Sequence, residues 1–157
     1  MLAETSGFGA PTVVTNVTRK RFGARVRSHT VFTDQGLNGG GTDSAPSPVE
    51  LLGAALGSCI AFYVREFCLA RRIEVEGMRV EVQQRNGTNP ARVAEFHVLI
   101  VLATELPSQY APVLDRVIRG CPVYNTLSGV ATIDVDVSTL SAISSHDFEE
   151  LADCSGK

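Results

Sequence analysis

The sequence predicts an α+β domain in which helices pack on antiparallel sheets, and three observations support this class. Residues 12–19 and 24–33 alternate between apolar and polar side chains, as strands do. A long helix is expected over about residues 48–72, and it is apolar on nearly every face between Leu51 and Val64. Two strands, a helix and a final strand follow, an order typical of helices packed on a sheet.

The first two strands are expected to form a hairpin, because only residues 20–23 separate them. Residues 34–48 are rich in Gly, Asp, Ser and Pro, which predicts an extended loop. The loop contains three consecutive glycines, but neither a Gly-Lys-Ser/Thr sequence nor the spacing of a dinucleotide-binding loop accompanies them. A phosphate-binding role is therefore not indicated.

The central helix has a strong start signal. Ser47 fits the N-cap, Pro48 the first helical position and Glu50 the third, which is the pattern of a capping box. The uncharged part of this helix, Leu51–Val64, is shorter than the ~20 residues that a membrane-spanning helix needs. We therefore expect a buried helix and no membrane partner.

The next two strands are expected over residues 78–84 and 92–103, with the turn between them at residues 86–90. The apolar run at residues 98–103 is typical of a strand that is covered on both faces. A helix over residues 107–119 should then follow the hairpin.

That helix should end at Gly120, a residue suited to a helix stop, and Pro122 can begin a further helical turn over residues 122–127. This leaves the Cys121 thiol at the N-cap of the turn. Residues 130–137 alternate cleanly and predict the last strand. We expect a single domain over residues 1–138 and a peripheral tail over residues 139–157.

Charge and composition exclude several classes of protein. A net charge of −3 argues against a dedicated nucleic-acid binder, and the one basic cluster fits a solvated hairpin: Arg19, Lys20, Arg21, Arg25 and Arg27. The first eleven residues lack the pattern of a secretory signal, so a cytoplasmic location is expected. The cysteines and histidines show no metal-binding spacing, and no cofactor is expected.

The four cysteines differ in their predicted surroundings. Cys121 at a helix N-terminus should have a stabilised thiolate, which is the reactive form. Cys59 lies in mid-helix among apolar residues, a position typical of a core cysteine. Cys68 is nine residues further along and faces the opposite side of the helix, whereas Cys154 is expected to be an incidental thiol of the tail.

Three segments resemble the OsmC/Ohr family: GGTD at residues 40–43, PSPVELLGAALGSC at 46–59 and RGCPV at 119–123. The likeness in element order covers about residues 12–138. The resemblance implies an intertwined homodimer with two sites at the subunit interface. It further implies that Cys59 attacks the peroxide and that Cys121 resolves the oxidised Cys59.

The implied activity is that of a thiol-dependent peroxidase, which reduces organic hydroperoxides and is reset by a small thiol or a lipoyl-type reductant. The family site also has a Glu directly after the Pro, where this sequence has Val49. Glu50 is one position further on and is explained by the capping box. The family Arg has four candidates in the basic cluster: Arg19, Arg21, Arg25 and Arg27.

Two other functions stay open at this point. In the first, an apolar interface pocket binds a small hydrophobic or electrophilic ligand without turnover, and the displaced Glu favours this alternative. In the second, the cysteine pair is a redox sensor whose disulfide changes contacts with a partner.

Overall fold

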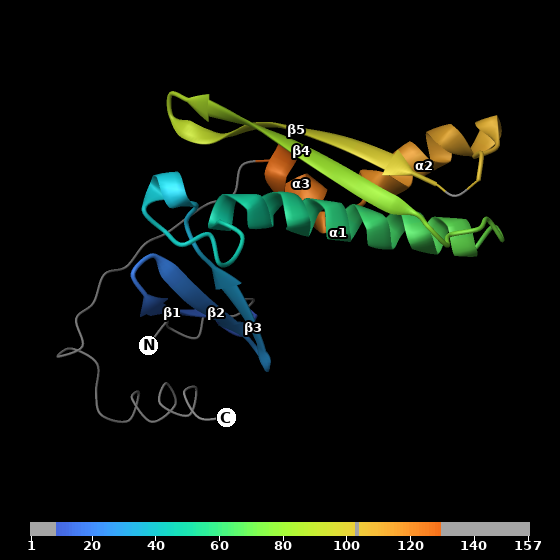
Figure 1. Cartoon of the computed structure of the whole chain (residues 1–157). Coiled ribbons are helices and arrows are strands. Elements are labelled where there is room, and N and C mark those ends of the chain that lie inside the picture. The colour runs from blue at the N-terminus through green and yellow to red at the C-terminus, as the bar shows by residue number, and fades with distance from the viewer. Residues whose placement is uncertain (1–8, 103, 130–157) are drawn as a thin grey trace. The chain divides into compact units, whose positions relative to one another are not determined.

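The structure is a computed structural model that describes residues 9–102 and 104–129. Its elements are strands and helices of an α+β protein, and all of them lie within one compact unit, Thr12–Val130 (Figure 1). The expected strand at residues 130–137 and the expected tail at 139–157 lie outside the described residues, so both remain predictions.

A three-stranded antiparallel sheet comes first, with strand order β1-β2-β3 and these bounds: β1 Val13–Thr18, β2 Arg21–Val26 and β3 His29–Thr33. The expected single strand over residues 24–33 is wrong, because a tight turn at Arg27 and Ser28 divides it. Arg27 adopts a positive φ of 56°, although no Gly or Asn marks the turn in the sequence. Arg27 therefore lies in a turn, and does not share a strand face with Arg25 and His29.

The loop after β3 is folded around the buried carboxylate of Asp34, which is 2% exposed. One oxygen accepts the Gln35 N–H at 2.8 Å, and the other accepts the Thr42 N–H at 3.0 Å and the Thr42 hydroxyl at 2.6 Å. Ser44 donates from its N–H and its hydroxyl to that second oxygen. The Thr42 hydroxyl and these N–H donors hold the pKa of Asp34 well below its usual range. The expected extended loop is thus a compact one.

Gly41 permits this compact loop. A Cβ at this position would lie 1.9 Å from the Gln35 carbonyl oxygen, so no larger residue fits without moving the backbone. The loop also includes a short 3₁₀ helix, η1 Leu37–Gly39, and the Lys20 ammonium donates to the Gly39 carbonyl at 2.6 Å.

The long helix α1, Pro48–Leu69, begins as expected. The Ser47 hydroxyl accepts the Glu50 N–H at 3.3 Å, and the Glu50 carboxylate accepts the Ser47 N–H at 2.7 Å. The capping box is therefore confirmed. Gly57 allows close packing on strand β4, Arg79–Thr88, since a Cβ there would lie 3.0 Å from the Val82 side chain.

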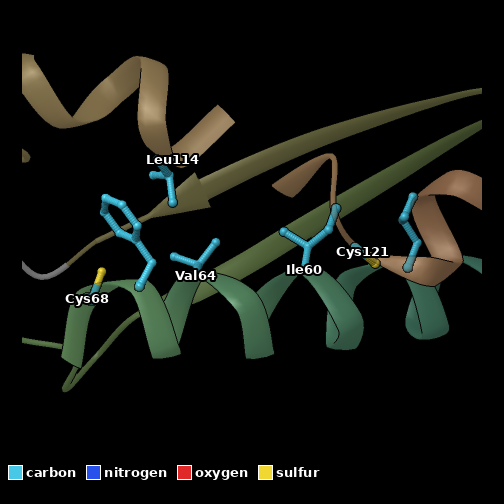
Figure 2. Packing of buried hydrophobic residues seen from close by; sticks show 7 residues of the cluster. Ile60, Val64, Cys68, Leu114 and Cys121 are labelled. Atoms are coloured by element: carbon cyan, nitrogen blue, oxygen red, sulfur yellow. The ribbon is translucent and has the colours of Figure 1, made fainter. Parts of the chain in front are cut away.

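One side of α1 forms the core. Figure 1 shows the second hairpin and the helices α2, Ala111–Ile118, and α3, Pro122–Ser128, gathered on this side. Figure 2 shows Leu114 of α2 pointing toward Val64 of α1. The buried side chains are Leu56, Ile60, Val64, Phe67, Cys68, Leu114 and Cys121.

The other side of α1 is not covered by the residues that the structure describes, so the helix is not buried on every face by these residues alone. Leu52 is 42% exposed and Phe62 is 60% exposed, and Leu69 is exposed as well. The helix is long and apolar enough to cross a membrane by length and composition alone, but core helices of globular domains meet the same criteria. Its packed side is that of a core helix, and its open side needs a different explanation.

The second hairpin pairs β4, Arg79–Thr88, with β5, Ala91–Val101. The expected end of the first strand at residue 84 and turn from residue 86 are wrong, because Asn86 and Gly87 lie within β4 just after a bulge. The turn is at Asn89-Pro90 instead. Within the described residues the apolar run at 98–103 is covered on one face: Val98 and Ile100 pack on the core, whereas Leu99 is 49% exposed.

The helix expected over residues 107–119 is divided into a 3₁₀ turn, η2 Ser108–Tyr110, and α2. The further helical turn after Pro122 is confirmed as α3. These two helices have only Arg119, Gly120 and Cys121 between them. The short connection places Cys121 in the core.

Replacing Asp34 by Asn should lower the free energy of unfolding at neutral pH, because one amide oxygen cannot accept from all the donors around Asp34. The pKa of the folded carboxylate lies below its unfolded value of about 3.9, so its stabilising effect is complete above that pH. The effect is lost as the pH falls through the folded pKa. Thermal unfolding at pH 7 and pH 3 should therefore show a smaller difference between wild type and variant at pH 3.

Asp43→Asn is the matched control for this prediction. Asp43 is exposed in the same loop, and its side chain makes no hydrogen bond with the residues that the structure describes. An equal loss of stability in both variants, or a difference that does not change with pH, would contradict the role given to Asp34.

Candidate functional site

Two cysteines that are 62 residues apart in the sequence lie together in the fold. The sulphur atoms of Cys59 and Cys121 are in disulfide contact, with their Cα atoms 6.2 Å apart. Cys121 is fully buried, and Figure 2 shows it beside the part of α1 that carries Ile60. Of the four cysteines, the structure thus brings together the two that the family resemblance selects.

Each cysteine is placed by its own helix. Cys59 is partly buried and lies on α1 between the core residues Leu56 and Ile60 and the open side of the helix. Cys121 is the N-cap of α3, as the sequence predicts, and its sulphur accepts the Tyr124 N–H at 3.4 Å. Packing of α3 on α1 then determines that the two sulphur atoms meet.

Cys68 takes no part in the pair. It is a buried free thiol near the end of α1, and burial raises its pKa. Figure 2 shows Cys68 well separated from Cys121, with Val64 and Ile60 between them along α1. A buried, protonated thiol is a poor nucleophile, so Cys68 is a structural residue. Cys154 lies outside the described residues.

Glu50 lies away from the cysteine pair. Its carboxylate accepts hydrogen bonds from the N–H and the hydroxyl of Ser47, and these bonds lower the pKa of Glu50. Glu50 also lines a shallow groove of about 480 Å³ between α1 and β4. The cysteines do not line this groove. The position of Glu50 is explained by the helix cap, and the geometry gives it no contact with Cys59.

The side chains of the four candidate arginines make no hydrogen bond or ion pair with a residue of the cysteine site. Arg21 lies over the Phe32 ring at 4.6 Å, within the three-stranded sheet. No hydrogen bond or ion pair joins the side chain of Arg19, Arg25 or Arg27 to a residue of the described ranges. None of the four is thereby assigned to the chemistry of Cys59.

Arg119 lies two residues before Cys121 and was not among the site residues predicted from the sequence. The Arg119 guanidinium donates to the Asp115 carboxylate and to the Tyr124 hydroxyl, both at 2.9 Å. The Asp115 and Arg119 pair at four-residue spacing could be found from the sequence, since such opposite charges meet on one helix face. The Tyr124 contact depends on how the chain turns after α2, which no local pattern specifies.

The site has the groups for thiol and disulfide chemistry. Among the described residues, no group of three or more His, Cys, Asp or Glu side chains could hold a metal ion. Two cysteines within bonding reach can exist as a dithiol or as a disulfide, and can pass electrons between a thiol and an oxidant.

Comparison with known proteins gives a family and a fold. The sequence profile of the family described as OsmC-like protein matches residues 41–136. A protein from Psychrobacter arcticus 273-4, provisionally described as an osmotic stress induced and detoxification response protein, is 25% identical with a TM-score of 0.70; the match covers 78% of this chain and 91% of that one. No curated protein matches the sequence.

Two other solved structures share the fold at lower identity. An OsmC-like protein from Mycoplasma pneumoniae is 20% identical with a TM-score of 0.59, covering 78% of this chain and 91% of that one. A protein from Vibrio cholerae O1, provisionally described as an organic hydroperoxide resistance protein, is 16% identical with a TM-score of 0.52, covering 80% and 90%.

Oxidation of the reduced protein should link Cys59 to Cys121 and leave Cys68 free, because the Cα atoms of Cys59 and Cys121 are 6.2 Å apart, which a disulfide permits, whereas Cys68 is a buried free thiol. Peptide mapping after one equivalent of a mild oxidant measures the products. A Cys121→Ser variant should instead accumulate sulfenic or sulfinic acid on Cys59. A Cys68→Ser variant is the control and should give the wild-type linkage. Linkages made chiefly through Cys68 or Cys154 would contradict the pairing.

Proposed function

The chain belongs to the OsmC-like protein family, and on that premise we propose that it is a thiol-dependent peroxidase that reduces organic hydroperoxides. The family is linked to hydroperoxide resistance and to the stress response. The observation that carries the proposal is the contact between Cys59 and Cys121, since a two-cysteine peroxidase needs its two sulphur atoms within bonding reach.

The proposed reaction begins at Cys59. Its thiolate attacks one peroxide oxygen, the O–O bond breaks, and the alkoxide leaves as an alcohol after taking a proton. Cys59 is then a sulfenic acid. The Cys121 thiol attacks this sulphur, a disulfide forms, and the hydroxyl leaves as water with the proton from Cys121. A small dithiol or a lipoyl-type thiol reduces the disulfide by exchange and is itself oxidised.

The surroundings of the two cysteines fit these separate tasks. Cys59 is only partly buried, and it adjoins the open apolar side of α1 where Leu52 and Phe62 are exposed. An organic hydroperoxide with an apolar tail would bind such a surface through burial of its hydrocarbon part. Cys121 is buried in contact with Cys59, and its sulphur accepts the Tyr124 N–H, so it lies where it can attack the oxidised partner.

We further propose that a second copy of the chain covers the open side of α1. Leu52, Phe62 and Leu69 form an exposed stripe on this helix. Val14, Phe22 and other apolar residues of the three-stranded sheet are exposed as well. Exposed apolar surface of this kind marks an interaction site, and most soluble oligomers are symmetric homo-oligomers. A homodimer would enclose the surroundings of Cys59.

A cytoplasmic location is part of the proposal, since a reducing compartment supplies the thiols that reset the disulfide. The second candidate function is binding of a small apolar or electrophilic ligand without turnover. It is favoured by one observation: the described contacts bring neither a carboxylate nor a guanidinium to Cys59. Turnover measurements separate the two functions.

Consumption of cumene hydroperoxide with a dithiol reductant should fall to the background rate in a Cys59→Ser variant, because the thiol that attacks the peroxide is then absent. Cys68→Ser is the matched control and should keep the wild-type rate. Glu50→Gln should also keep that rate, because a Gln at this position can still form the capping box and Glu50 has no contact with Cys59. The proposal is refuted if wild type consumes cumene, t-butyl and hydrogen peroxides no faster than the Cys59→Ser variant.

Light scattering at micromolar concentration should give twice the chain mass of 16.8 kDa for the wild type. Phe62→Glu should shift the protein toward the monomer, because it places a charge in the exposed apolar stripe. Leu37→Glu is the control: Leu37 is also exposed, but it lies in the loop before α1. A monomeric wild type, or equal dissociation in both variants, would rule out the proposed dimer surface.

A further inference from the structure

A bridge of three side chains crosses the turn that carries Cys121. The Arg119 guanidinium donates from Nε to Asp115 on α2 and from Nη1 to the Tyr124 hydroxyl on α3, each at 2.9 Å. A single side chain therefore joins the two helices that flank Cys121. We propose that Arg119 is a positioning residue that directs the Cys121 thiol toward Cys59, an inference that rests on the proposed function.

The direction of the Cys121 thiol depends on this turn because the side chain has only one torsion before its sulphur. Only Arg119 and Gly120 separate Cys121 from α2. The Gly120 N–H bonds to Val117 and the Cys121 N–H to Ile118, each at 3.0 Å, so the backbone of the turn continues from α2. A change in the angle between α2 and α3 would turn the Cβ–Sγ bond away from α1.

Tyr124 connects the bridge to the sulphur itself. Its hydroxyl accepts from Arg119, and its backbone N–H donates to Cys121 Sγ at 3.4 Å. When Arg119 holds the Tyr124 side chain, it holds the residue that contacts the sulphur. A guanidinium suits this task, since it is planar, always charged and bonds two partners in fixed directions.

The bridge lies at the surface, where it adds little to global stability. The side chains of Arg119 and Asp115 are 60% and 62% exposed. Exposed ion pairs of this kind contribute little to folding. Substitutions in the bridge should therefore give folded protein, and an effect on the cysteine pair can be measured separately.

The step that the bridge controls is closure of the disulfide. In turnover, Cys121 attacks the Cys59 sulfenic acid and water leaves. With oxidised glutathione as the oxidant, the Cys59 thiolate first attacks one glutathione sulphur, the glutathione S–S bond breaks, and one glutathione thiolate leaves. The Cys121 thiolate then attacks the Cys59 sulphur of this mixed disulfide, and the second glutathione thiolate leaves. Both reactions need the same approach of Cys121 Sγ to Cys59 Sγ.

The experiment measures the equilibrium between the dithiol and the 59–121 disulfide in defined mixtures of reduced and oxidised glutathione. Arg119→Gln should lower the equilibrium constant for closure about tenfold, because misdirected reacting groups lose effective concentration. Tyr124→Phe should lower it in the same direction, since it removes only the contact on α3. Arg116→Gln is the matched control: it removes an exposed arginine that lies within α2, three residues before Arg119, and it should leave the equilibrium constant unchanged.

Arg119→Lys tests whether charge alone is sufficient. A lysine keeps the charge but lacks the planar guanidinium, so the disulfide of this variant should close as poorly as that of Arg119→Gln. Full closure in Arg119→Lys would overturn the bridge geometry. The positioning role is also overturned if Arg119→Gln closes as well as Arg116→Gln, or if its reduced form unfolds at a clearly lower temperature than that of Arg116→Gln.

This test does not depend on peroxide chemistry. If wild type fails to reduce hydroperoxides but its disulfide closure with glutathione depends on Arg119 as described, the proposed function fails while the positioning role stands. If wild type reduces hydroperoxides and its disulfide closure does not depend on Arg119, the positioning role fails while the proposed function stands. The two failures are therefore distinguishable.

Discussion

Packing of the α2–α3 turn against α1 is the interaction on which the candidate site depends. Cys59 and Cys121 belong to different helices and are 62 residues apart, so their contact exists only when both helices share the core. Leu114 of α2 and Ile60 of α1 are buried in that core. The hydrophobic contacts that stabilise the fold thus also hold the two sulphur atoms within bonding distance.

The same helix has two sides with different physical roles. Toward the hairpin of β4 and β5, Gly57 allows close approach, and Val64 and Phe67 are buried. On the opposite side, Leu52 and Phe62 remain exposed, and Cys59 lies at the border between the two. The proposed peroxidase uses this border: the core supplies Cys121, and the open side admits an apolar substrate and a second chain.

Local signals in the sequence predicted what local interactions determine. The start of α1 followed from Ser47, Pro48 and Glu50, and the N-cap position of Cys121 followed from Gly120 and Pro122. The turn at Arg27 and Ser28 was missed because Arg27, which adopts the positive φ, is not a typical turn former and the single Ser has no Gly, Asn, Asp or Pro beside it. The Asp34 loop and the Arg119 bridge to Tyr124 depend on tertiary folding, which single-sequence patterns do not encode. The pairing of Cys59 with Cys121 came only from the family resemblance.

The central claim is that Cys59 and Cys121 together carry the two electrons given to a hydroperoxide. A single-turnover measurement tests it most directly: fully reduced protein is mixed with less than one equivalent of cumene hydroperoxide and no other reductant. The account predicts one Cys59–Cys121 disulfide for each molecule of alcohol formed. Alcohol formed while Cys59 stays a free thiol, or peroxide left unconsumed by the reduced protein, would contradict it.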